Sequence, residues 1–154
     1  MNLSNFKHSN TYNWFCDFLD YKIEVNLNSE GPINSYSEII KKINEWDNNF
    51  FIKLESMLFD FYEDTLIMCG ETEPTINSKA DIWGFMRIGS IEIINDGSEK
   101  FIMLTGGCDW EEEHGLEIDI NENGRVLYVG CFIGNGYSDD PDNPMYSNFV
   151  QGDI

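Results

Sequence analysis

The sequence predicts an α+β fold in which an antiparallel β-sheet packs against one kinked helix or two consecutive helices. Three patterns predict it. Residues 20–28 alternate between polar and apolar side chains, which is the period of a half-buried strand. Apolar residues then recur at steps of three and four from Ile39 to Phe61, as on one face of a helix. The second half of the chain repeats short β-favouring segments between turn residues.

The N-terminal region is predicted to form a strand or a hairpin. Every second residue from Tyr21 to Leu27 is apolar, and the residues between them are polar. The preceding segment 14–19 is also β-favouring, because it is rich in aromatic residues. A tight turn near Asp20 would pair the two segments, and residues 29–32 then end the strand.

The helical region is predicted to begin near Ser35. Ser35 and Glu38 have the spacing of a capping box, in which each side chain binds a free backbone N–H at the start of a helix. The apolar stripe continues to about Tyr62, which is longer than one ordinary helix. Residues 47–49 offer a break and a new N-cap, so one kinked helix and two consecutive helices both fit.

After a polar loop at residues 70–79, the chain is predicted to form a β-meander. The strand-like segments are 82–88, 90–94, 101–105, 116–120 and 126–132. Residues 95–97 and 123–124 supply Asn, Asp and Gly, which tolerate the positive φ that hairpin turns require. We expect a single α+β domain over residues 1–134. Residues 135–154 are rich in Gly, Asp, Asn, Pro and Ser and predict an irregular polar tail.

The charge of the chain limits its partners. Of 154 residues, 28 are acidic and 9 basic, which gives a net charge of −19. Nucleic acid and anionic membranes are therefore not expected as partners, because both are bound through Lys and Arg. A field of this sign attracts basic proteins instead. The acidity could also serve only to keep the protein soluble.

The cysteines and the N-terminus predict a reduced, cytoplasmic protein. The four cysteines are widely spaced and lack a C-x-x-C pair, which does not predict a structural zinc site. Residues 1–13 are polar and carry no apolar signal segment. No apolar run approaches the roughly 20 residues of a membrane span. No motif for a bound cofactor is present, so none is expected.

The segment 108–115, which reads Cys-Asp-Trp-Glu-Glu-Glu-His-Gly, concentrates the candidate chemistry. Its carboxylates and imidazole could hold a divalent metal ion, although the spacing is not that of a helical H-E-x-x-H motif. Glu112 or Glu113 could instead act with His114 as a general acid and base. A purely structural interpretation also fits. In it Trp110 anchors the loop in the core, His114 bonds a backbone carbonyl, Gly115 takes an unusual φ, and the glutamates face water.

The segment 109–118, followed by a turn and the strand-like run 126–130, resembles a family of small uncharacterised bacterial domains. Members carry a Trp, Glu, His, Gly box before a hydrophobic strand, a short turn and a strand that ends in Gly. The order of the upstream segments is also similar, so the resemblance covers residues 14–134. It implies a fold and a bacterial origin but no activity. Some members are similar to immunity proteins of toxin systems.

Two functional hypotheses follow, beside a third in which the acidity gives only solubility. The leading one is a non-enzymatic protein-interaction module, with immunity-type binding of a basic toxin as its finer form. Interfaces favour a buried aromatic residue ringed by polar groups. The binding candidates are therefore Asp109, Trp110, Glu111, Glu112, Glu113 and Asp119. The alternative is a divalent-metal-dependent or acid–base hydrolytic enzyme that uses Glu112, Glu113 and His114.

Overall fold

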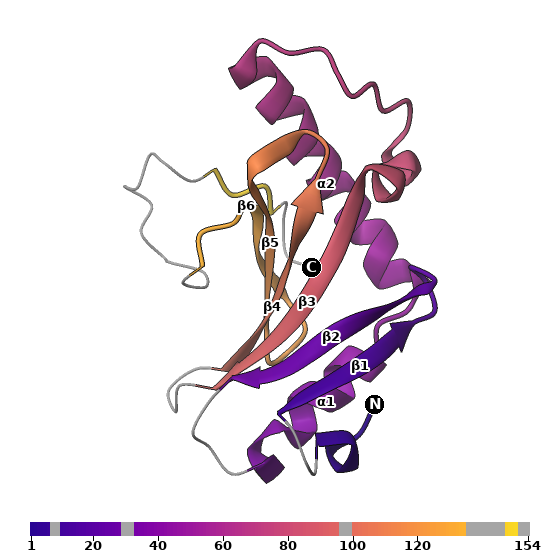
Figure 1. Ribbon diagram of the computed structural model, residues 1–154, viewed down its shortest axis with the longest axis vertical. Helices are drawn as coiled ribbons and strands as arrows, with labels where there is room; N and C mark the ends of the chain where they lie inside the picture. Colours follow the sequence, from indigo (N-terminus) through magenta and orange to yellow (C-terminus); the bar gives the residue numbers. More distant parts are fainter. Residues whose placement is uncertain (7–9, 29–32, 96–99, 135–146, 151–154) are drawn as a thin grey trace.

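The structure is a computed structural model that describes residues 1–6, 10–28, 33–95, 100–134 and 147–150 (Figure 1). In this part of the chain six strands form one sheet, and their order in the sheet is their order in the sequence. The strands are β1 (Thr11–Cys16), β2 (Tyr21–Asn28), β3 (Met86–Asn95), β4 (Lys100–Cys108), β5 (Glu111–Asn121) and β6 (Val126–Cys131). The β2–β3 pair is parallel and the other four pairs are antiparallel. The predicted α+β fold, with an N-terminal hairpin and a C-terminal meander, is confirmed.

The N-terminal hairpin forms as its sequence predicts. Strands β1 and β2 pair from Thr11 opposite Asn26 to Cys16 opposite Tyr21. Asp20 adopts a left-handed φ of 57° in the connecting turn, and its backbone N–H donates to the Cys16 carbonyl at 2.9 Å. Asp is among the few residues with a side chain that tolerate this conformation, which explains the turn at this position.

Two consecutive helices, rather than one kinked helix, follow β2. Helix α1 (Ser37–Asn44) ends before helix α2 (Asn48–Cys69), and Asp47 caps α2 by accepting the Phe50 N–H at 3.0 Å. The predicted break and its new N-cap are thus confirmed. The predicted capping box at Ser35 is wrong. A 3-10 turn, η2 (Ile33–Tyr36), leads into α1, and the Ser35 hydroxyl instead accepts a bond from Asn95 Nδ2 at 2.9 Å.

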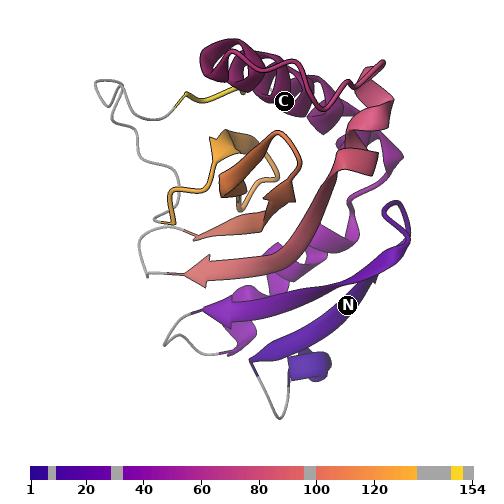
Figure 2. The ribbon, with the colours of Figure 1, turned by 45° about the horizontal axis from the view of Figure 1, so that its top comes forward.

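The helices and the sheet enclose one hydrophobic core. Helices α1 and α2 lie in the connection between the parallel strands β2 and β3, where a crossover is required. Fully buried side chains from the sheet, such as Ile91 and Ile118, belong to one cluster with Leu58 and Phe61 of α2. Figure 2 shows the twist of the sheet and places helix α2 on the side of strands β5 and β6. No helix of the described segments is long and apolar enough to cross a membrane.

The meander differs from its prediction at the N-terminal end of the segment that contains β3. Residues 82–85 belong to a 3-10 helix, η3 (Lys79–Phe85), and not to a strand. Ile82 there is fully buried, and the Trp83 indole donates to Glu55 of α2 at 2.9 Å, so packing on the helix decides the conformation. Part of the predicted turn at 95–97 lies outside the described residues. The turn at Gly124 is confirmed by its φ of 85°.

The predicted C-terminal tail falls mainly outside the described residues. Its described part, residues 147–150, lies against β6. The Phe149 N–H donates to the Val129 carbonyl at 3.0 Å, and Asn148 Nδ2 donates to the Leu127 carbonyl at 2.8 Å. The Phe149 ring lies 5.4 Å from that of Phe61. This segment therefore covers the outer edge of the sheet and packs on α2.

Candidate functional site

The acidic segment found in the sequence lies at the turn between β4 and β5. Cys108 pairs with Glu111 across a two-residue turn, whereas Gly106 pairs with Leu116. Residues 112–115 of β5 therefore lie opposite the single residue Gly107, which makes a wide bulge in the strand. Gly115 closes this bulge with a φ of 77°, as the structural interpretation of the sequence expects. Bulges of this kind redirect side chains away from the regular alternation of a strand.

Trp110 anchors the turn to helix α2. Its side chain is buried, with 4% of its surface exposed. The indole ring makes edge-on contacts with Phe61 at 5.9 Å and Tyr62 at 5.8 Å between ring centroids. Edge-to-face pairs add to the free energy of burial. The indole N–H is buried and has no acceptor among the described residues.

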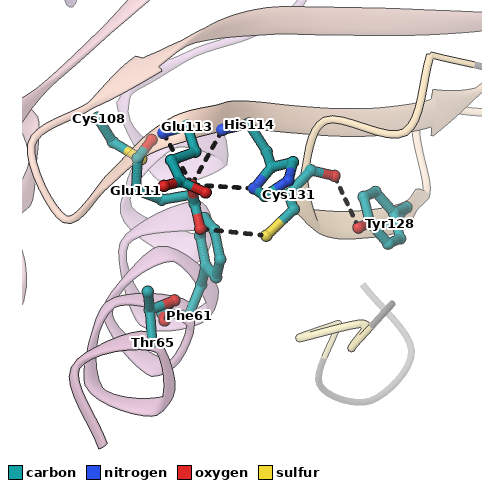
Figure 3. Close-up of polar contacts among 8 residues, drawn as sticks. All are labelled: Phe61, Thr65, Cys108, Glu111, Glu113, His114, Tyr128 and Cys131. Carbon is teal, nitrogen blue, oxygen red and sulfur yellow. Dashed lines mark hydrogen bonds and ion pairs between the residues drawn. The ribbon is translucent and has the colours of Figure 1, made fainter. Parts of the chain in front are cut away.

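Glu111 organises the bulge from inside (Figure 3). Its Oε1 accepts backbone N–H bonds from Glu113 at 3.0 Å and His114 at 2.9 Å, and it lies 3.2 Å from His114 Nδ1. Its side chain is 14% exposed. Burial alone would raise the pKa of Glu111, but the His114 and Glu113 donors hold that pKa below its ordinary value. Glu111 is therefore a structural carboxylate that stays ionised at neutral pH.

Replacing Glu111 with Gln is expected to destabilise the fold by about 1–2 kcal/mol at neutral pH, because charge-assisted bonds to backbone N–H groups are lost. Because the pKa of Glu111 is lower in the folded protein than in the unfolded chain, ionised Glu111 stabilises the fold at pH values above its unfolded pKa of about 4.3. This stabilisation disappears as the pH falls through the pKa of Glu111 in the folded protein. Urea unfolding of both proteins between pH 3 and 7 measures it. The two stabilities should converge below about pH 4, and an equal difference at every pH would contradict this role.

The other candidate residues are distributed unequally over the surface. Asp109, Glu112, Glu113 and His114 are exposed, whereas Asp119 is fully buried. Glu111, rather than Glu112 or Glu113, contacts His114, and the imidazole faces this carboxylate rather than the expected backbone carbonyl. The structure thus gathers four of the six binding candidates on one exposed turn, with Trp110 beneath them and Asp119 apart in the sheet.

A groove of about 760 Å³, here called the acidic groove, lies between the turn and the end of α2. Six of its nine lining residues are carboxylates, and none is Lys or Arg. The lining residues are Cys69, Glu71, Glu73, Pro74, Asp109, Trp110, Glu111, Glu112 and Glu113. Helix α2 has no basic residue in its last turn, and the negative end of its dipole adds to the field. The groove therefore favours a cationic ligand.

A second hollow of about 570 Å³, here called the glycine-lined hollow, adjoins the same turn. It shares Asp109, Glu111 and Glu112 with the acidic groove. Its other lining residues are Gly84, Phe85, Met86, Arg87, Gly89, Gly106, Gly107, Cys108 and Gly115. The Arg87 guanidinium lies 4.2 Å from the centre of the Tyr21 ring and makes a cation–π contact with it.

Several residues of these sites could not be found from the sequence. Glu71 and Glu73 lie far from the box in the chain, and only the packing of α2 on the sheet brings them to the groove. Glu117 is fully buried and accepts the backbone N–H groups of Ile133 at 3.0 Å and Gly134 at 2.8 Å. The alternation of side chains along a strand could have predicted that Glu117 and Asp119 lie on one face of β5, but it could not have predicted that this face is buried.

Within the described residues, no group of three His, Cys, Asp or Glu side chains is arranged to hold a metal ion.

The cysteine thiols near the turn differ in accessibility. Cys108 is buried, Cys131 is partly buried and 3.9 Å from Glu111 Oε2, and Cys69 is exposed. Burial raises the pKa of Cys108 to about 12, and burial with the Glu111 carboxylate raises that of Cys131 to about 11. Both thiols are therefore protonated at neutral pH and are weak nucleophiles.

Iodoacetamide at pH 8 is expected to alkylate Cys69 first, because the thiolate is the reactive species and Cys69 is the exposed cysteine. Peptide mass spectrometry of the native protein measures the order of labelling. Cys108, Cys131 and the buried Cys16 should react only after denaturation. Fast labelling of Cys131 in the native protein would contradict the placement of its thiol beside the Glu111 carboxylate.

Comparison with known proteins identifies the family of the chain but no relative of known function. A family model described as a domain of unknown function (DUF6985) matches residues 2–136. No curated protein matches the chain, and no solved structure matches it.

Proposed function

Because the chain belongs to the DUF6985 family, whose description states no function, we propose a function from the chemistry of its residues: it is a non-enzymatic interaction module that binds a basic segment of another protein in the acidic groove. The acidic groove carries this proposal. Six carboxylates line it and none of its lining residues is Lys or Arg, so like charges face each other in the free protein. A partner that brings Arg or Lys relieves this repulsion and gains charge-assisted hydrogen bonds.

The end of helix α2 supplies apolar surface next to these charges. Ile67 is 78% exposed and Met68 is 76% exposed, and they directly precede Cys69 of the groove. Protein interfaces combine apolar contacts, often through Met, with polar groups at the rim. The proposed partner segment is therefore basic, with apolar side chains that cover this last turn of α2.

Fluorescence anisotropy with a labelled oligo-arginine peptide tests the proposal. The groove variant Glu112→Lys/Glu113→Lys should bind the peptide at least about ten-fold more weakly at low salt, and the loss should shrink as salt rises. The matched control Asp17→Lys/Glu63→Lys has the same net charge but changes exposed residues outside the groove. Equal weakening in both variants would mean that overall charge, and not the groove, binds the peptide.

The finer form of the proposal is an immunity-type role, in which the bound protein is a basic toxin. It is supported by the charge and size of the chain and by the resemblance of its box to a family of which some members are similar to immunity proteins. Co-expression should relieve the growth inhibition caused by a basic toxin encoded beside the gene, and the groove variant should relieve it less than its control. A gene neighbourhood without such a toxin would end this form of the proposal.

A further inference from the structure

Strand β1 forms one edge of the sheet, and part of its backbone faces away from the protein (Figure 1). The Leu27 N–H donates to the Asn10 carbonyl at 2.8 Å, so every second residue from Asn10 onwards directs its backbone groups towards β2. The backbone groups of Asn13 and Phe15 point the other way, and no described residue bonds them. A row of unpaired N–H and C=O groups is a template for a further strand.

The two edges of the sheet differ in how they are protected. The outer edge of β6 is covered by residues 147–150. At β1, the 3-10 turn η1 (Leu3–Phe6) packs near the start of the strand, where the Phe6 ring lies 5.8 Å from that of Tyr12. Strand β1 contains no charged residue, no proline and no bulge, which are the usual devices that keep an edge from pairing. The middle of this edge is therefore open to another strand.

We propose that β1 pairs antiparallel with β1 of a second copy of this chain, which joins the two sheets into one across a two-fold axis at Trp14. In this register Asn13 of each copy lies opposite Phe15 of the other, and each such pair exchanges two backbone hydrogen bonds. The inference goes beyond the proposed function and does not rest on it. The acidic groove lies at the β4–β5 turn, away from this edge, so each copy keeps its groove.

This register also covers the aromatic side chains at the edge. Trp14 is partly buried and packs edge-on against Trp46, with 6.1 Å between ring centroids. The two copies of Trp14 would be direct neighbours on that face, in a non-hydrogen-bonded pair, where side chains are closest. On the other face Phe15 is 45% exposed, and its two copies would lie diagonally across the axis. Pairing thus removes apolar surface from water on both faces of the sheet.

The distribution of charge favours a second copy over a basic partner at this edge. The chain has 28 acidic and 9 basic residues, but β1 has no carboxylate that a basic strand could pair with. Two copies can meet here without placing like charges directly opposite, which would destabilise the pair. On β2, exposed Lys22 lies beside Phe15 and exposed Glu24 lies beside Asn13. The two-fold axis therefore places Lys22 of one copy in the same row as Glu24 of the other.

Sedimentation velocity over a range of protein concentrations, combined with amide hydrogen exchange, tests the inference. The mass should approach twice that of the monomer as the concentration rises. Added salt should strengthen the association, because it screens the repulsion between two chains of net charge −19. The amides of Asn13 and Phe15 should gain protection with concentration, whereas the β1 amides that face β2 should be protected at every concentration.

Two variants of the edge, each with a matched control, locate the interface. Asn13→Pro removes an N–H that makes no bond within the described chain, so its melting temperature should stay within about 4 °C of wild type. Its dimerisation should weaken at least about ten-fold, whereas Asn13→Ala keeps the N–H and should dimerise as wild type. Phe15→Glu brings two carboxylates together at the axis and should weaken dimerisation even if Asn13→Pro folds poorly. Its control, Ile52→Glu, changes an exposed apolar residue of α2 and has the same net charge.

A dimer that weakens in both edge variants, and not in their controls, supports the inference. A protein that stays monomeric up to about 1 mM overturns it, and so does a dimer that neither edge variant weakens. Protection of Asn13 and Phe15 that does not depend on concentration also overturns it, because the chain itself would then cover the edge.

Discussion

Replacing Trp110 with Ala is expected to destabilise the protein by about 3–5 kcal/mol, the range for removing a buried aromatic side chain. Trp110 is 4% exposed and packs edge-on against Phe61 and Tyr62, so its loss leaves a cavity between the β4–β5 turn and α2. For a chain of this length, the melting temperature should fall by roughly 10 °C. The turn that carries the candidate binding residues should loosen first, because no other aromatic residue of the turn anchors it.

The variant Trp110→Phe separates ring packing from hydrogen bonding. Phe keeps an aromatic ring against Phe61 and Tyr62, and the lost indole N–H has no acceptor among the described residues. The Trp110→Phe variant should therefore lose less than about 2 kcal/mol of stability, because only side-chain volume is removed. Urea unfolding monitored by circular dichroism measures both variants. Equal and small losses for Ala and Phe would contradict the placement of Trp110 in the core.

Replacing Gly115 with Ala is expected to cost about 3 kcal/mol or more. The left-handed φ of 77° alone costs an L-residue roughly 1–2 kcal/mol. In addition, the new Cβ would lie 2.6 Å from the Gly106 carbonyl oxygen, so β4 and β5 must separate locally. The bulge that carries Glu112, Glu113 and His114 should lose its shape with this change.

Gly107→Ala serves as the control for this effect, because its Cβ would meet nothing within 4 Å and its φ is not left-handed. Thermal unfolding should show little change for Gly107→Ala and a large fall for Gly115→Ala. A neutral Gly115→Ala would mean that β5 does not bulge where the structure places the bulge.

The local periodicity of the sequence predicts most of the fold because the strands and helices each bury one regular face. The alternation in β2 and the Asp47 cap of α2 are local features, and both are confirmed. The segment 82–85 is also β-favouring, but it forms a 3-10 helix because Ile82 and Trp83 pack on α2. Ser35 fails as a cap because Asn95, distant in the chain, bonds its hydroxyl. In both failures a long-range contact overrides a local preference.

The candidate site is only partly visible in the sequence for the same reason. The box 109–114 is contiguous, so its exposed carboxylates could be named directly from the chain. Glu71 and Glu73 join them only after α2 has packed on the sheet. Asp119 has the same chemistry as its neighbours in the box, but strand β5 carries it into the interior. Burial of a carboxylate depends on what covers the strand, and a local pattern does not report that.

Amide chemical shifts of the labelled protein, recorded during titration with the oligo-arginine peptide, test the central claim most directly. The account predicts that the largest changes fall on Cys69, Glu71, Glu73 and residues 109–113, which line the acidic groove. Exposed acidic positions elsewhere, such as Asp17 and Glu63, should change little. Changes spread evenly over all exposed carboxylates would contradict the claim that the acidic groove is the binding site of this protein.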